Sequence, residues 1–170
     1  DSGLDGFASR ESASSDIPIT PRVALEVFVL NSVLPHQMVN AESHGGSYAL
    51  LLVKCDNRDL KAKRRFLQEE IVRVHPGDIS PETTGISLEH LGLYSLCLSV
   101  LEGNRSQPRL PLLVRSDSIF ALRCLLFHDY PEDLPNYLAD LLQSVRYLEE
   151  RCDIRYGYLE TLGTPDKVLN

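Results

Sequence analysis

The spacing of apolar residues toward the carboxyl end places the strongest constraint on the fold. These residues recur at alternating intervals of four and three: Leu134, Leu138, Leu141, Val145, Leu148 and Cys152. Such a period puts them on one side of a helix, with charged and polar residues on the other side. The repeat covers less than three heptads, which is short for a coiled coil, so a helix in the core is favoured and an intermolecular zipper is the alternative. The segment therefore predicts a helix that faces a core.

Two further helices are indicated by their capping residues. Ser87 precedes an apolar segment over residues 88–102, and Ser116 or Asp117 precedes a second one over residues 118–128. Serine and aspartate are favoured at the amino-terminal cap because their side chains accept hydrogen bonds from the first free backbone N–H groups. Both segments therefore predict helices, the first of them buried on most sides.

A surface helix is predicted from a charged segment that carries one apolar stripe: Leu60, Leu67, Ile71 and Val74. The intervals of seven, four and three match the helical period. Asp56 or Asn57 provides a cap, and Pro76 with Gly77 marks the end of the helix.

Residues 23–34 have two interpretations. The segment is apolar on nearly all sides and follows Thr20 and Pro21, a favourable helix start. Its apolar residues also alternate with the period of a strand, and many are β-branched. The helix is slightly favoured. Residues 48–54, an apolar run behind two glycines, predict a buried strand, so that two extended segments would form a hairpin.

The predicted fold class is mainly α, an irregular helical bundle of about five helices with a short strand or hairpin near the amino terminus. An α+β fold is the alternative. Residues 112–149 look like an antiparallel helix pair. Residues 17–170 are expected to form a single helical domain, and residues 1–16 a flexible Ser-rich tail or linker. The tail offers candidate phosphorylation sites: Ser9, Ser12, Ser14 and Ser15.

Charge and motifs exclude several function classes. The net charge of −7 argues against nucleic acid or an anionic membrane as a partner, and no run of 18 apolar residues predicts a membrane span. The four cysteines lie far apart in the sequence, and no two of the five histidines have the spacing of a metal site. No phosphate-binding glycine loop or nucleophile elbow occurs. The sequence predicts no catalytic residue, metal site or cofactor.

The sharpest local charge feature is the basic run at residues 61–65. On a helix, Arg65 would meet Glu69 four residues further on, so a solvated helix face is the favoured interpretation. Some positive charge is left without an acidic neighbour, which makes a protein-binding surface the alternative. Its candidate residues are Arg58, Lys61, Lys63 and Arg65.

These features favour a noncatalytic protein–protein interaction domain, an adaptor or scaffold excised from a larger polypeptide, since the chain does not begin with Met. Its partner would be another protein. One alternative is an enzyme that lacks any short recognisable motif, and another is a self-assembling structural protein. Reduced, mostly buried thiols are the expected state of the cysteines, which favours the cytoplasm or the nucleus.

Overall fold

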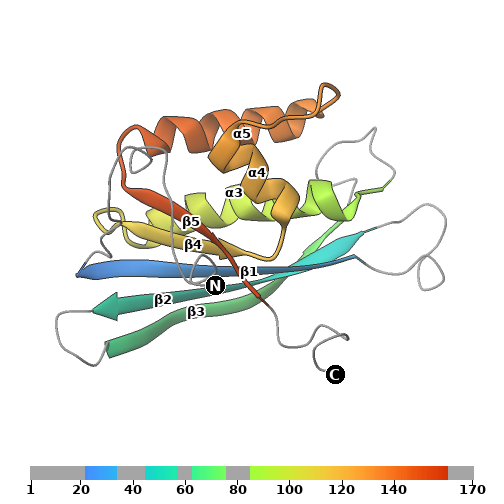
Figure 1. Ribbon diagram of the computed structural model, residues 1–170. Coiled ribbons are helices and arrows are strands. Elements are labelled where there is room, and N and C mark those ends of the chain that lie inside the picture. Colours follow the sequence, from blue (N-terminus) through green and yellow to red (C-terminus); the bar gives the residue numbers. More distant parts are fainter. Residues whose placement is uncertain (1–21, 34–44, 57–62, 76–84, 161–170) are drawn as a thin grey trace.

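The computed structural model describes residues 22–33, 45–56, 63–75 and 85–160. Its described part has two layers, a five-stranded sheet and three helices packed on one side of it (Figure 1). The elements in chain order are β1 (Val23–Val33), β2 (Gly46–Asp56), β3 (Lys63–Val74), α3 (Leu88–Ser106), β4 (Leu112–Ser116), α4 (Ile119–Phe127), α5 (Asn136–Glu149) and β5 (Ile154–Tyr158).

The sheet has two halves that meet at β1. The strands β1, β2 and β3 form an antiparallel meander, whereas β4 runs parallel to β1 and β5 runs parallel to β4. The spatial order is β3-β2-β1-β4-β5, so the chain moves outward from β1 on one side and then returns to its other side. Helix α3 packs against β1, β2 and β4, while α4 and α5 pack against α3.

The strand β1 shows that the helix favoured for residues 23–34 is wrong. Leu25 and Val27 are fully buried on the sheet face that contacts α3. Ala24 and Glu26 point to the opposite face and are also buried. A central strand covered on both faces needs apolar residues at nearly every position, so its sequence resembles that of a buried helix.

The strand β3 shows that the surface helix predicted before Pro76 is also wrong. β3 is an edge strand that pairs along its length with β2, with a β-bulge near Leu67. Phe66 is 71% exposed and Ile71 is 73% exposed. Of the predicted stripe, Ile71 is therefore exposed, whereas Val74 lies in the core, so the stripe does not face the core as one surface. Backbone pairing with β2 accounts for the extended conformation. The many charged side chains on β3 are typical of edge strands, which they protect against pairing with other chains.

The helices predicted from capping residues are confirmed. The hydroxyl of Ser87 accepts a hydrogen bond from the His90 backbone N–H at 3.1 Å and caps α3. The cap of α4 is Ser118, which accepts from the Ala121 N–H at 3.1 Å, and not Ser116 or Asp117.

The antiparallel helix pair predicted for residues 112–149 is wrong in its first part. Residues 112–116 form β4, whose apolar residues are buried on both faces of the sheet. Residues 154–158 form β5 beside β4.

The fold is therefore α+β, the stated alternative, and the mainly α bundle is wrong. That residues 17–170 form one domain stays a prediction. The predicted tail at residues 1–16 lies outside the described residues, so its boundary stays a prediction. All four cysteines are free thiols, and Cys55, Cys97 and Cys124 are buried. Within the described ranges, every helix is too short or too polar to cross a bilayer.

Candidate functional site

The candidate site lies where two strands end side by side. β1 and β4 are adjacent and parallel, so their carboxyl ends meet at one edge of the sheet, and the strand order reverses between them. In open α/β sheets, ligands bind in the crevice at such a switch point. Asn31 lies near the carboxyl end of β1, and Asp117 directly follows the last residue of β4. The topology thus brings together two polar residues that are 86 positions apart.

A hydrogen-bonded triplet is formed by Asn31, Asp117 and Ser95 of α3. The Asn31 side-chain Nδ2 donates to Asp117 Oδ1 at 2.8 Å, and the Asn31 backbone N–H donates to Asp117 Oδ2 at 3.2 Å. The Ser95 hydroxyl donates to Asn31 Oδ1 at 2.5 Å. Ser95 is fully buried, whereas Asn31 and Asp117 are half-buried. The triplet therefore runs from the core outward, with its carboxylate at the outer end.

The orientation of the Asn31 amide follows from its two neighbours. A carboxylate can only accept hydrogen bonds, so the amide nitrogen of Asn31 must point toward Asp117. Its oxygen then points toward Ser95 and accepts the hydroxyl proton. A reversed amide would place its oxygen against the Asp117 carboxylate. Each member of the triplet is thus held in one hydrogen-bonding role.

The close packing of α3 against the start of α4 positions Asp117. A Cβ atom added to Gly92 of α3 would lie 2.3 Å from the Ser118 hydroxyl oxygen, closer than any real contact. Ser118 caps α4, and its own N–H donates to the Ser116 hydroxyl at 3.0 Å. Because Asp117 lies between these two serines, glycine at position 92 is what allows α3 to approach this bend.

The chemistry available at the triplet is that of a single carboxylate beside a neutral amide. Both Asp117 oxygens accept hydrogen bonds from Asn31. Among the described residues, no group of three or more His, Cys, Asp or Glu side chains is arranged to hold a metal ion. The arrangement offers one anionic oxygen pair at the sheet edge, which suits a cation that brings other ligands with it.

Comparison with known proteins identifies the fold. No protein-family model matches the sequence, and no curated protein matches it. Among solved structures, the prototype foamy virus protease-reverse transcriptase matches with a TM-score of 0.62 and 9% identity, over 92% of this chain and 21% of that chain. LC11-RNase H1, isolated from compost, matches with a TM-score of 0.54 and 10% identity, over 86% of this chain and 91% of that enzyme. The chain has an RNase H-like fold.

A third match is LC9-RNase H1, described as a type 1 RNase H with the type 2 active-site motif. It has a TM-score of 0.53 and 14% identity, over 84% of this chain. The present chain covers only 65% of the length of LC9-RNase H1 and about a fifth of the length of the viral protein. At these identities the likeness concerns the fold.

The matches contradict the predicted function class. The noncatalytic adaptor is wrong as the leading interpretation, because the solved structures that this chain resembles include RNase H enzymes. The alternative of an enzyme without a short motif agrees better with an RNase H-like fold. The argument against nucleic acid as a partner is contradicted as well, since the matched LC9-RNase H1 and LC11-RNase H1 are RNases. The net charge of the chain does not predict whether nucleic acid is a partner, because binding depends on local contacts.

The basic residues predicted to bind a partner do not reach the triplet. Lys63 and Arg65 are exposed on β3, and Lys63 pairs with Asp56, at the end of the sheet opposite Asn31. Eight residues of β1 separate the two ends, which corresponds to about 26 Å. Arg58 and Lys61 lie outside the described residues, as do the candidate phosphorylation sites Ser9, Ser12, Ser14 and Ser15. Their roles stay predictions.

Sequence analysis missed the residues of the triplet. Asp117 was considered only as a helix cap, and Asn31 was not singled out within the apolar segment 23–34. The available signal was the short apolar run Leu112–Val114 followed by a polar turn into a helix. This pattern is typical of a buried strand whose carboxyl end carries functional residues.

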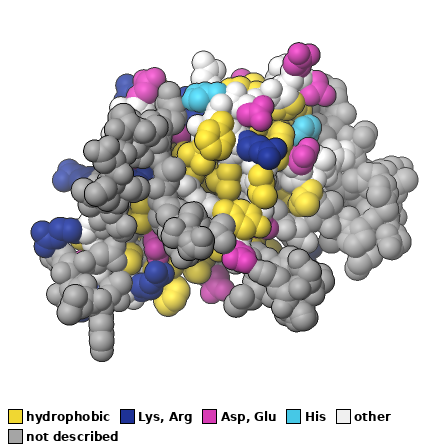
Figure 2. Space-filling model, viewed as in Figure 1, with side chains coloured by type: hydrophobic (Ala, Val, Ile, Leu, Met, Phe, Trp, Pro, Cys, Tyr) yellow, Lys and Arg dark blue, Asp and Glu magenta, His cyan; other side chains and the backbone are white. Residues whose placement is uncertain are grey.

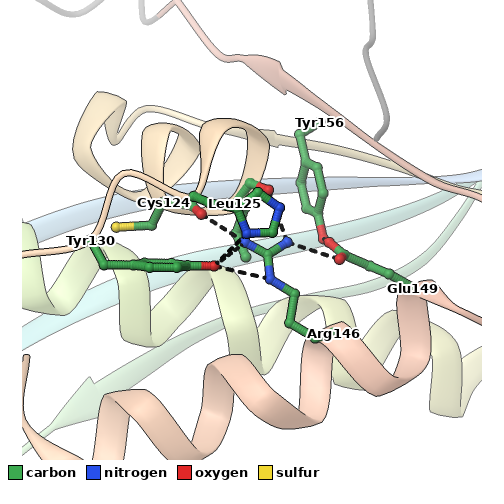
Figure 3. Close-up of polar contacts among 7 residues, drawn as sticks. Cys124, Leu125, Tyr130, Arg146, Glu149 and Tyr156 are labelled. Carbon is green, nitrogen blue, oxygen red and sulfur yellow. Dashed lines mark hydrogen bonds and ion pairs between the residues drawn. The ribbon is translucent and has the colours of Figure 1, made fainter. Parts of the chain in front are cut away.

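A second polar cluster surrounds Arg146 of α5 (Figure 3). The guanidinium donates to the backbone carbonyls of Cys124 and Leu125 at 2.7 and 2.9 Å, and to Glu149 Oε1 at 2.9 Å. Tyr130 also accepts from it. Since these donors are all directed at groups of the same chain, the cluster joins α4 to α5 and is not a second ligand site.

Proposed function

We propose that this chain acts on nucleic acid as an RNase H-like phosphodiester hydrolase. The observation that best supports this proposal is the half-buried Asp117 carboxylate, which Asn31 holds by hydrogen bonds at the switch point of an RNase H-like sheet. LC11-RNase H1, which shares the fold, has been crystallised with an RNA/DNA hybrid. The substrate class we infer is a duplex that contains an RNA strand.

Burial at the triplet supports access from solvent on the side of Asp117. Ser95 is fully buried behind Asn31, whereas Asn31 and Asp117 each keep part of their surface exposed. A polynucleotide strand at the carboxyl ends of β1 and β4 would therefore approach Asp117 first. The hydrogen bonds from Asn31 fix the carboxylate before the strand arrives, which lowers the ordering cost of binding.

Nucleases commonly hold divalent cations between carboxylates and phosphate oxygens. Mg²⁺ is often bound through one or two carboxylates together with substrate phosphates. Of the residues in the triplet, only Asp117 offers a carboxylate, so the donor set fits one cation that arrives with phosphate and does not fit a pair of cations. Such a cation would polarise a phosphoryl oxygen. The role of this chain is to hold Asp117 toward the strand.

The net charge of −7 sets a condition on binding. It repels a polyanion at long range, so affinity must come from local contacts and from bound cations. Figure 2 shows basic and acidic side chains interspersed around a central group of hydrophobic ones on one face. We expect hybrid binding to need millimolar divalent cation, which distinguishes this chain from a strongly basic nuclease.

The test is cleavage of an end-labelled RNA/DNA hybrid by the wild type and by Asp117→Asn, with Mg²⁺ and with Mn²⁺. The substitution removes the negative charge and keeps the shape of the side chain. We expect the rate to fall at least about 100-fold. The matched control is Asp133→Asn, because Asp133 is exposed in the turn before α5.

Three outcomes are informative. Cleavage that is lost in Asp117→Asn and kept in Asp133→Asn supports the proposal. Equal cleavage by all three proteins would place the reaction elsewhere or in a contaminant. Hybrid binding by the wild type without any cleavage would retain nucleic acid as the ligand and reject the hydrolase.

A further inference from the structure

We propose that the Asn31 amide takes the place of a divalent cation in the free protein, so that a cation enters this site only together with polynucleotide phosphate. The inference deepens the proposed function and rests on it where it concerns polynucleotide. The hydrogen bonding of Asp117 by Asn31 in the absence of a cation is a property of the protein alone. This part of the inference is therefore tested without any substrate.

The first step is what the Asn31 amide does for Asp117. Asn31 supplies two N–H donors, one from its side chain and one from its backbone, and each contacts a different oxygen of the carboxylate. Hydrogen bonds to an ionised group are stronger than those between neutral groups. They stabilise the charge of Asp117 with no cation present.

The second step is what connects this pair to the core. Ser95 donates to the amide oxygen of Asn31 at 2.5 Å, and its hydroxyl also lies 3.1 Å from the Gly92 carbonyl oxygen. Ser95 is fully buried in α3, the helix that packs on β1. The chain from Ser95 through Asn31 to Asp117 thus joins α3, β1 and the end of β4 with neutral donors only.

The third step is the effect of one added charge. An aspartate at position 31 would keep the shape of the side chain but would put a carboxylate oxygen where Nδ2 now lies, 2.8 Å from Asp117 Oδ1. Two carboxylates at that distance repel each other strongly unless a cation lies between them. The same pair of oxygens would then form a good site for a hard divalent cation.

The central experiment measures the melting temperature of the wild type and of Asn31→Asp, in chelator and in millimolar Mn²⁺ or Mg²⁺. We expect the wild type to melt at the same temperature under both conditions. Asn31→Asp should melt several degrees lower in chelator and should recover when cation is added. The matched control is Asn136→Asp, which adds the same charge at the exposed first residue of α5.

A second variant covers the case in which Asn31→Asp does not fold. The exchange Asn31→Asp with Asp117→Asn keeps one carboxylate and one amide and only reverses their positions. It should fold in chelator and melt close to the wild type, without a response to cation. Failure of the exchanged pair to fold, when cation also fails to rescue Asn31→Asp, would overturn the proposal.

Direct binding of Mn²⁺ to the wild type gives an independent measurement by electron paramagnetic resonance. We expect no saturable site on the free protein below about millimolar Mn²⁺, and a site that appears when a hybrid with a 2′-O-methyl RNA strand is added. Tight Mn²⁺ binding by the free wild type that disappears in Asp117→Asn would overturn the inference. A protein that binds no hybrid but gives the expected melting results would instead reject the proposed function.

Discussion

At the scale of single residues, Tyr156 shows how this fold keeps a charge inside. Its side chain is 1% exposed, and its hydroxyl donates to Glu149 Oε2 at 2.6 Å (Figure 3). The other oxygen of Glu149 accepts from Arg146. Burial and the neighbouring Glu149 charge raise the pKa of Tyr156 well above its ordinary value. The hydroxyl therefore stays protonated and continues to donate.

Replacing Tyr156 by Phe removes this donor and leaves Glu149 buried with one partner fewer. We expect Tyr156→Phe to lower the free energy of unfolding by about 1.5 to 3 kcal/mol, the range for hydrogen bonds to charged groups. Urea denaturation measures the loss. Tyr147→Phe is the matched control, because Tyr147 is 59% exposed on α5, the helix that carries Glu149. Equal losses for the two variants would contradict the role given to Tyr156.

At the scale of elements, sequence patterns succeeded for the helices and failed for most strands. Helices α3, α4 and α5 carry caps or a 3.6-residue period, which are local signals. By contrast, β1 and β4 are buried on both faces, so their apolar residues carry no period that separates them from a buried helix. The edge strand β3 fails for a different reason, because its apolar residues range from exposed Phe66 and Ile71 to buried Val74, and its pairing with β2 is set by distant residues.

Two residues of the predicted stripe, Ile71 and Val74, provide a direct test on β3. Ile71 is 73% exposed, whereas Val74 is 4% exposed. Ile71→Thr should change the free energy of unfolding by about 0.5 kcal/mol or less, as surface substitutions do. Val74→Thr keeps the shape but buries a hydroxyl, which costs about 1 to 3 kcal/mol. Chemical denaturation of both variants distinguishes the edge strand from the predicted surface helix. In the helix, both residues would face the core, and both substitutions would lower the free energy of unfolding.

At the scale of the whole molecule, buried thiols couple stability to alkaline pH. Burial raises the pKa of Cys97 from 9.0 to about 12 and that of Cys124 from 9.0 to about 11. In the unfolded chain these thiols release protons as the pH rises through 9, whereas in the folded chain they retain them. The unfolded state therefore binds fewer protons, and stability must fall as the pH rises.

We expect the free energy of unfolding to decrease from about pH 8 upward, approaching a slope of about 1.4 kcal/mol per pH unit for each thiol. The decrease ends as the pH passes the folded pKa values, about 11 to 12. Urea titrations between pH 8 and 9 measure the onset of this slope while the tyrosines, whose ordinary pKa is 10.0, are still largely protonated. Cys97→Ala should reduce the slope, and Cys152→Ala, at a half-buried position, is the control. If the slope is unchanged in Cys97→Ala, the loss of stability at alkaline pH does not come from this buried thiol.

The candidate site is assembled by the fold of the whole molecule from residues that are distant in the sequence. For this reason, no short sequence motif indicates it. Asp117 and Asn31 are each unremarkable in their local sequence, and they become a pair only because β4 returns beside β1. Ser95 joins them through the packing of α3 on β1. Spacing rules detect ligands that lie within one loop or one helix, so they do not detect a group assembled by sheet topology.

The parallel pairing of β1 with β4 also has a consequence in time. Asn31 and Asp117 are separated by 86 residues, and ribosomes add roughly 5 to 20 residues per second. The two halves of the triplet therefore leave the ribosome about 4 to 17 s apart. The β1–β2–β3 meander has all its residues available much earlier. During synthesis, the edge of β1 that pairs with β4 in the folded protein therefore stays unpaired until β4 has been made. Its backbone donors and acceptors can pair with other strands in that interval.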